Sequence, residues 1–106
     1  MDTDQLKFAL DSAVEGLSAV TWKRMFGCDA AFREGTIFAL VWKEGRIGLK
    51  YPDTPAFKER ISTSGSDRWG PGGRITKHWV LIPQAVASDP AVLLEWATQA
   101  HSLVNR

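Results

Sequence analysis

The single cysteine, Cys28, is the side chain in this sequence that could act as a nucleophilic thiolate. A reactive thiolate needs an electropositive neighbour, and Lys23 and Arg24 precede Cys28 closely in the chain. A lone cysteine without a partnered histidine motif is more often a small buried residue than a catalyst. We therefore expect Cys28 to be structural, with catalysis as the minor alternative.

Metal coordination by imidazole would involve His78 or His101, the two histidines of the sequence. A metal site takes three or four ligands, often spaced about two to four residues apart, and neither histidine has such neighbours. The Gly-rich loop at residues 69–74 also lacks the helix and the Gly-Lys-Ser/Thr ending that follow a phosphate-binding loop. We expect no metal site, no cofactor and no catalytic residue.

Charged residues are distributed unevenly along the chain. Residues 1–20 carry four acidic side chains and one basic one, whereas residues 21–50 carry six basic side chains and three acidic ones. Basic residues interleaved with tryptophans can bind nucleic acid, because cations hold the phosphates and rings stack on the bases. The alternative is a solvated strand face whose aromatic residues pack in the core. The candidates for nucleic-acid contact are Arg24, Arg68, Arg74 and Lys77.

Composition limits the class of protein further. The chain has 106 residues, of which 44% are hydrophobic and 24% charged, and its formal net charge is +1. This balance excludes a disordered chain, a fibrous protein and a nucleic-acid binder that relies on bulk positive charge. We expect one globular domain over residues 1–106, because single domains commonly contain about 100–150 residues.

No segment of the sequence is typical of a membrane span or a secretory signal. The longest uninterrupted apolar run, residues 37–42, is far shorter than the roughly 20 residues that a membrane-spanning helix needs. The acidic N-terminal segment lacks the basic start and the apolar stretch of a signal peptide. A single cysteine allows no internal disulfide, which fits a reducing compartment. We expect a cytoplasmic protein without membrane contact.

Three helices are predicted from apolar spacing and from the residues that cap them. An apolar stripe near the N-terminus follows Asp2, which stands in the capping position. A short helix is expected after residues 52–55, and the last helix begins after Asp89-Pro90. The wide apolar stripe in residues 92–104 predicts that this last helix packs on the core.

Strands are predicted between these helices. Turn-like tripeptides at residues 33–35 and 43–45 predict a three-stranded antiparallel meander. The resulting order, α-β-β-β-α-β-β-α, is typical of an α+β domain whose helices lie on one face of an antiparallel sheet. The expected strands are residues 24–32, 36–42 and 46–51, a short strand that starts at residue 68, and residues 78–82.

The middle strand, residues 36–42, is apolar on both sides. Strict alternation places Phe38, Leu40 and Trp42 on one face and the residues between them on the other. A sheet with one solvated face would alternate apolar with polar residues, so both faces should be covered. Helices should cover one face, and a partner subunit, a folded-over helix or a bound ligand the other. We expect Phe38, Leu40 and Trp42 to form a partner interface, most simply in a homodimer.

Several short motifs resemble those of one protein family. The motifs are Lys-Arg-Met-Phe-Gly at 23–27, Gly-Thr-Ile-Phe-Ala-Leu-Val-Trp at 35–42, Gly-Leu-Lys-Tyr at 48–51, His-Trp-Val-Leu-Ile-Pro at 78–83, and Asp-Pro with Leu-Glu-Trp at 89–96. Together they resemble the N-terminal domain of the TfoX/Sxy family, over residues 6–104. The resemblance implies an α+β fold with helices on one face of an antiparallel sheet, and it carries over no catalytic residue.

The same resemblance implies a regulatory role. The founding members of the family are bacterial regulators of DNA-uptake competence, which act as transcription coactivators with a cyclic-AMP-responsive activator and have no associated enzymatic activity. They carry a second, C-terminal domain with helix-hairpin-helix character, for which a chain ending at Arg106 has no room. We therefore expect a stand-alone N-terminal domain, with a transcription regulator among its candidate partners.

Three hypotheses for function follow, each from a different class. The leading one is a non-enzymatic protein-interaction or regulatory module. The alternative is a small-molecule binder or minor enzyme that uses the sheet face near Cys28, Trp69 and His78. A pocket with convergent polar groups would support this alternative, and a filled face would exclude it. The second alternative is direct nucleic-acid binding through the four basic residues named above.

Overall fold

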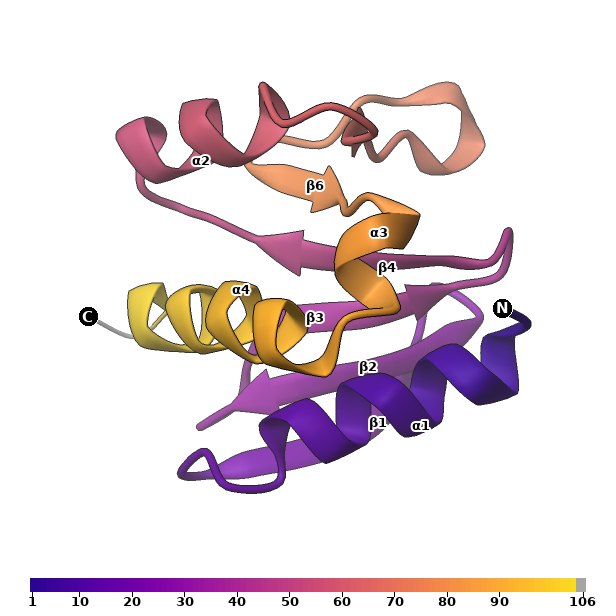
Figure 1. Ribbon diagram of the computed structural model, residues 1–106, viewed down its shortest axis with the longest axis vertical. Helices are drawn as coiled ribbons and strands as arrows, with labels where there is room; N and C mark the ends of the chain where they lie inside the picture. Colours follow the sequence, from indigo (N-terminus) through magenta and orange to yellow (C-terminus); the bar gives the residue numbers. More distant parts are fainter. Residues whose placement is uncertain (105–106) are drawn as a thin grey trace.

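A six-stranded antiparallel sheet forms the centre of the computed structural model, which describes residues 1–104 (Figure 1). The strands are β1 (Val20–Met25), β2 (Cys28–Arg33), β3 (Thr36–Trp42), β4 (Arg46–Lys50), β5 (Asp67–Arg68) and β6 (Trp79–Leu81). They lie side by side in the order β1-β2-β3-β4-β6-β5. The helices are α1 (Thr3–Val14), α2 (Thr54–Ile61), α3 (Gln84–Ala87) and α4 (Pro90–Leu103), and a 3-10 turn, η1 (Pro71–Gly73), precedes β6.

Aspartate side chains cap the starts of α1, α2 and α4. Asp2 accepts a hydrogen bond from the Gln5 backbone N–H at 2.8 Å, and the Gln5 side chain accepts one from the Asp2 N–H at 2.9 Å. Asp53 and Asp89 accept hydrogen bonds from backbone N–H groups in the first turns of α2 and α4. Each cap stands where the sequence predicts the start of a helix.

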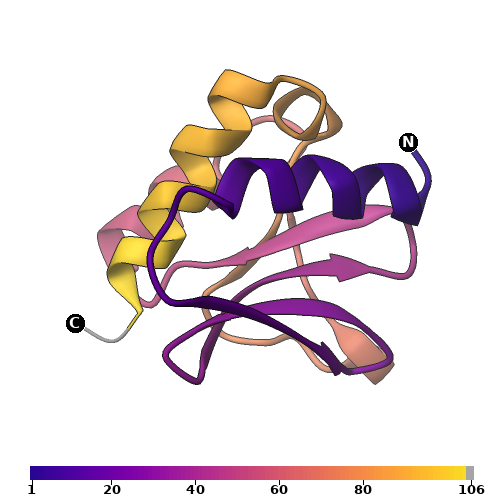
Figure 2. The same cartoon turned by 90° about the horizontal axis from the view of Figure 1, so that it is seen from below.

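The helices pack on one face of the sheet, and Figure 2 shows α1 and α4 against the same side of the strands. Their buried side chains form one large core with residues of β2, β3, β4 and β6. The predicted class, an α+β domain with helices on one face of an antiparallel sheet, is confirmed. Beyond the predicted elements, the structure contains the short helix α3 and one more strand.

The additional strand arises because residues 24–32, predicted as one strand, belong to two. β1 and β2 pair as far as Met25 and Cys28, with Phe26-Gly27 as the turn between them. Both turn residues have positive φ, 54° at Phe26 and 73° at Gly27, as in the type I′ turns that join twisted strands. Such turns are usually recognised in a sequence by Asn-Gly or Asp-Gly. Phenylalanine rarely adopts this backbone conformation, and Phe26-Gly27 was therefore not predicted as a turn.

A β-bulge changes the face that Phe38 occupies. The pairing of β3 with β2 shifts by one residue beside Phe38, which is left without a partner in β2. Phe38 lies in the helix-side core, and its ring contacts the ring of His101 on α4 with centroids 5.3 Å apart. Strict alternation fails at a bulge. The prediction that Phe38 shares a face with Leu40 and Trp42 is therefore wrong.

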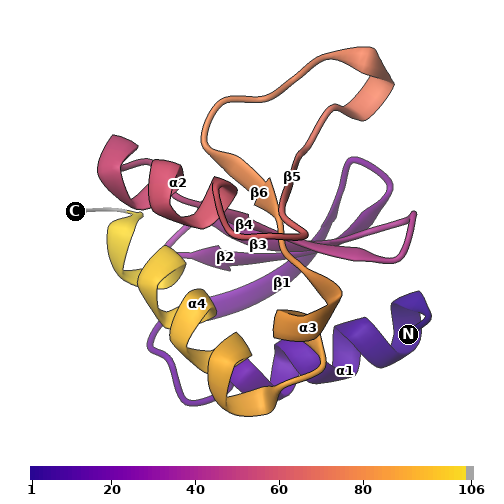
Figure 3. The ribbon, with the colours of Figure 1, turned by 45° about the horizontal axis from the view of Figure 1, so that its top comes forward.

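Leu40 and Trp42 point to the other face of the sheet, which the chain covers with its own segment between β5 and β6 (Figure 3). Trp69 in this segment is 1% exposed, and its ring lies edge-on to those of Trp42 and Trp79 at 5.3 and 5.0 Å. Phe38, Leu40 and Trp42 are all buried. The prediction that they form a partner interface is wrong, because the chain itself covers them. The other buried members of this smaller core are Cys28, Ala30, Phe32 and Leu81.

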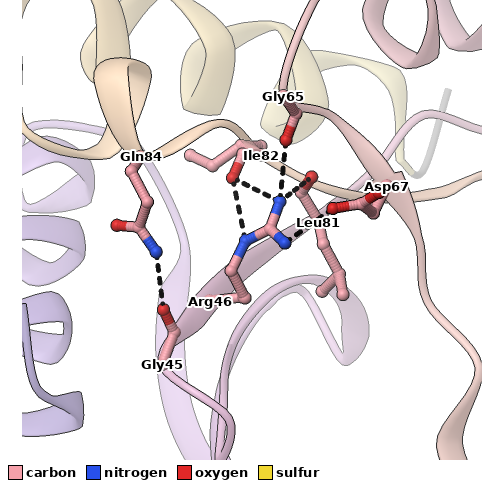
Figure 4. Close-up of polar contacts among 7 residues, drawn as sticks. All are labelled: Gly45, Arg46, Gly65, Asp67, Leu81, Ile82 and Gln84. Atoms are coloured by element: carbon pink, nitrogen blue, oxygen red, sulfur yellow. Dashed lines mark hydrogen bonds and ion pairs between the residues drawn. The ribbon is translucent and has the colours of Figure 1, made fainter.

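Arg46 on β4 ties the covering segment to the sheet (Figure 4). Its guanidinium donates hydrogen bonds to the carbonyl oxygens of Gly65 at 3.0 Å, Leu81 at 2.9 Å and Ile82 at 3.0 and 3.3 Å. It also forms an ion pair with Asp67 at 2.7 Å. Arg46 thus contacts the chain where it enters β5 and again where it leaves β6, so it holds both ends of the covering segment.

Candidate functional site

An apolar groove of about 830 Å³ runs between α1 and the segment that leads from α3 into α4. Ligand sites in proteins commonly have volumes of about 300–1,000 Å³, so the volume of this groove falls within that range. Its lining residues on α1 recur at helical spacing and thus form one face of that helix. The groove is lined by Met1, Asp4, Gln5, Phe8, Ala9, Ser12, Ala13, Ala87, Ser88, Pro90, Leu93 and Leu94.

Helix α1 has a second apolar face besides the one that it buries. Leu6 and Leu10 are buried in the large core, whereas Phe8 is 75% exposed. Successive residues of a helix are rotated by about 100°, so Phe8 points away from the stripe that contains Leu6 and Leu10. Across the groove, Leu94 on α4 is 47% exposed. Large apolar side chains therefore face solvent on both sides of the groove.

Three acidic side chains lie on the exposed side of α1 and its C-cap residue Glu15, and one of them lines the groove. Asp4 lines the groove, and Asp11 and Glu15 follow it at intervals that keep them on nearly the same side of the helix. None of these carboxylates forms an ion pair within residues 1–104. The basic residue of α1, Lys7, points elsewhere, with its ammonium 4.4 Å from the ring centroid of Trp22 on β1. The groove therefore has apolar walls and an acidic rim, by which we mean Asp4 in its lining with Asp11 and Glu15 on the exposed helix surface beside it.

A second cavity, of about 360 Å³, lies between α2, β5 and the segment just before β6. The guanidinium of Arg68 lies 5.1 Å from the ring centroid of Phe57, and the ring of His78 lies edge-on to Phe57 at 5.6 Å. We call this cavity the basic pocket, because cationic side chains surround an aromatic and apolar floor. It is lined by Thr54, Phe57, Lys58, Ile61, Arg68, Lys77 and His78.

The structure brings together two of the four residues predicted to contact nucleic acid. Arg68 and Lys77 line the basic pocket, whereas Arg24 and Arg74 line neither cavity. Arg24 donates a hydrogen bond to the carbonyl oxygen of Gly27 at 2.9 Å, within its own hairpin. Arg74 is exposed in the loop after η1. The four residues thus do not gather in one cavity, and contact with nucleic acid stays a prediction.

Comparison with known families agrees with the fold. A family model described as the TfoX N-terminal domain matches residues 12–103. This chain belongs to that family. No curated protein shows a significant match to the sequence. Within this TfoX N-terminal domain, the family match begins at Ser12, so Phe8 and the first turns of α1 precede the matched residues.

Cys28 and Trp69 of this TfoX N-terminal domain lie together in the smaller core, but His78 packs against α2 instead. Burial raises the pKa of the Cys28 thiol, and its Sγ–H donates a hydrogen bond to the Met25 carbonyl oxygen at 3.1 Å. A thiol with a raised pKa holds little nucleophilic thiolate at neutral pH. Side chains fill this sheet face, so Cys28, Trp69 and His78 do not meet in the common site that the sequence suggested.

The other histidine of this TfoX N-terminal domain, His101, is buried at the end of α4. Its Nε2 lies 2.7 Å from the carbonyl oxygen of Ser18, so the ring ties α4 to the loop after α1. Across residues 1–104, no three His, Cys, Asp or Glu side chains are grouped so that they could hold a metal ion. No helix in the described part of the chain is long and apolar enough to cross a membrane.

Sequence reasoning identified none of the groove-lining residues of this TfoX N-terminal domain and missed several that line the basic pocket; Phe8, Leu94 and Lys58 show why. Phe8 carried a usable signal, because it lies off the helical stripe of buried leucines. Leu94 carried none, since it falls within the continuous apolar run of the last helix. Lys58 lies opposite Arg68 because α2 packs beside β5 and β6, an arrangement that local sequence does not encode.

Proposed function

We propose that this chain is a non-enzymatic interaction module that binds a partner protein through the groove between α1 and α4. The observation that carries the proposal is the exposure of Phe8 and Leu94 on the two sides of one apolar groove. Contiguous exposed apolar patches are typical of interaction sites. Membership in the TfoX N-terminal domain family favours a regulatory role, with a transcription regulator as the partner class.

The shape of the groove suits a helix supplied by the partner. Its walls are the exposed face of α1 and the start of α4. An amphipathic helix binds such a groove through apolar side chains at every third or fourth position, while its outer face stays in solvent. Phe8 and Leu94 would then lie on either side of the bound helix and contact its apolar anchors. Aromatic residues at such positions commonly dominate binding energy.

The charges beside the groove favour a basic partner over a second copy of this chain. Two copies that dock through α1 would bring Asp4, Asp11 and Glu15 of each chain toward their equivalents, and like charges across an interface weaken association. Lysine or arginine residues that flank the apolar anchors of a partner helix would instead complement this rim. A homodimer through the groove is the alternative outcome of the experiment below.

A photocrosslinking residue at the groove identifies the occupant directly. The chain is produced in its native cells with a benzophenone amino acid in place of Phe8, and in a matched control in place of Thr98, which is exposed on α4 and outside the groove lining. The expected product is an adduct at position 8 whose crosslinked peptide is an apolar helix flanked by basic residues. The control at position 98 should not give this adduct.

The outcomes separate the alternatives. An adduct between two copies of the chain would assign the groove to a homodimer and contradict the basic partner. Absence of any adduct at position 8, or equal adducts at positions 8 and 98, would contradict a docking site in the groove.

A further inference from the structure

We propose that the basic pocket binds a phosphate monoester that carries a ring, as a site separate from the α1–α4 groove. The pocket is lined by residues of α2, β5 and the segment before β6, so the fold assembles it from parts distant in sequence. No acidic residue is among those that line it. The cationic side chains that line it are Lys58, Arg68 and Lys77, and the imidazole of His78 lies beside them.

The positive charge of the pocket is not neutralised by neighbouring carboxylates. Within residues 1–104 none of the three basic side chains forms an ion pair. The carboxylate next to Arg68 in sequence, Asp67, is paired with Arg46 at 2.7 Å. Asp53, at the start of α2, accepts a hydrogen bond from the backbone of its own helix. Three unpaired cations around one small cavity match a doubly charged phosphate monoester better than a singly charged anion.

The strand that carries the arginine of the pocket is fixed, and the exposed arginine side chain packs on an aromatic ring of the pocket. Its guanidinium lies over the Phe57 ring, and β5, which carries it, is fixed by the hydrogen bonds of Arg46 to Gly65 and by pairing with β6. A guanidinium offers two parallel N–H donors that match two phosphate oxygens. Prior positioning lowers the entropy that binding must overcome.

The floor of the pocket explains why the ligand carries a ring. Phe57 and Ile61 give the cavity an apolar surface between its cationic groups, which a bare inorganic ion would leave uncovered. His78 has a φ of 65°, in the left-handed region, and its carbonyl oxygen accepts a hydrogen bond from the Tyr51 N–H at 2.8 Å. Such backbone conformations cluster at ligand sites. Here the conformation sets the imidazole against Phe57, at the side of the cavity.

The experiment is a titration of the 15N-labelled chain with phenyl phosphate, inorganic phosphate and benzyl alcohol, followed by amide chemical shifts. Phenyl phosphate should shift residues of α2 and the start of β6, and it should bind at least tenfold more tightly than phosphate or benzyl alcohol. Arg68→Gln and Lys77→Gln should each weaken binding at least tenfold. The matched control Arg74→Gln, in the same covering segment but outside the pocket, should leave binding unchanged.

Each other result overturns the proposal. Equal binding of phenyl phosphate and inorganic phosphate would remove the role of the ring. Unchanged binding in Arg68→Gln and Lys77→Gln, shifts confined to other elements, or no binding at 10 mM would remove the site. A thymidine 12-mer that binds the pocket far more tightly than phenyl phosphate, with an affinity that falls steeply with salt, would assign the pocket to a polynucleotide instead.

Discussion

Trp69 and Phe8 are both large aromatic side chains, yet their surroundings are opposite. Trp69 lies on the sheet face away from the helices and is 1% exposed, because three aromatic rings and the strands beneath enclose it. Phe8 stands on the outer face of α1 and is 75% exposed. The apolar sheet face, which pattern alone suggested as an interface, is closed by the chain itself. The groove at Phe8, by contrast, stays open to solvent.

The difference has a physical consequence for mutation. Removing a buried ring leaves a cavity and loses its packing, whereas removing an exposed ring leaves the folded state almost unchanged. A surface that evolved to bind should therefore tolerate substitution in the free protein and lose affinity for its partner. The predictions below test this contrast in order of expected effect.

Trp69→Ala should lower the free energy of unfolding by about 3–5 kcal/mol, since it removes the ring that covers the smaller core. Urea unfolding at neutral pH measures this loss. Trp69→Phe should lose clearly less, because the indole Nε1–H of Trp69 has no hydrogen-bond partner within the described residues. A loss below about 1 kcal/mol in Trp69→Ala would show that the sheet face does not depend on this cover.

Arg46→Met should lower the free energy of unfolding by about 2–3 kcal/mol, because the carbonyl oxygens that accept from its half-buried guanidinium would lose a charged donor. Hydrogen exchange should accelerate most in the segment between β5 and β6. The matched control Asp67→Asn should lose less than about 1 kcal/mol, since its carboxylate is 64% exposed. Equal losses in both variants would contradict the role given to the carbonyl contacts.

Tyr51→Phe should lower the free energy of unfolding by about 1 kcal/mol near neutral pH, because the hydroxyl donates a hydrogen bond to the Trp96 carbonyl oxygen at 2.8 Å. Burial raises the pKa of Tyr51 above its ordinary value of 10.0. The folded chain therefore keeps a proton that the unfolded chain releases, and stability falls as pH rises above about 10. Urea midpoints across that range should fall less steeply in Tyr51→Phe than in the wild type; equal slopes would contradict the burial of this hydroxyl.

Phe8→Ser should have the smallest effect, a change of at most about 0.5 kcal/mol in the free energy of unfolding. The side chain is mostly exposed, so folding buries little of its surface. The matched control Leu10→Ser, two residues along the same helix and fully buried, should lose several times more. Comparable losses in the two variants would show that Phe8 serves the fold and would remove the contrast with Trp69.

The sequence predicted most of the fold because its signals were local. Capping aspartates, helical apolar spacing and Glu-Gly turns each depend on neighbouring residues, and they located α1, α4, β3 and β4. The Phe26-Gly27 turn was not predicted, because phenylalanine seldom adopts the positive φ that it has here. The bulge at Phe38 was not predicted, because the alternation of side chains between the two sheet faces assumes that neither strand contains an extra residue.

The candidate sites were less predictable, because they depend on which surfaces the folded chain leaves open. Arg68 and Lys77 were identified by type, but their meeting with Lys58 follows from the packing of α2 beside β5 and β6. Leu40 and Trp42 matched the pattern of an interface, and the covering role of Trp69 could not be inferred from a Gly-rich loop. Periodicity identifies apolar faces, while the path of the whole chain decides which of them is covered.

Titration of the 15N-labelled chain with a synthetic amphipathic helix tests the central claim most directly. The peptide, of about five helical turns, carries leucines at every third or fourth position and lysines on both flanks. We predict shifts confined to α1 and the start of α4, and at least tenfold weaker binding by Phe8→Ser but not by Arg68→Gln. Shifts on other elements, or equal affinity of the wild type and Phe8→Ser, would contradict a docking site in the groove.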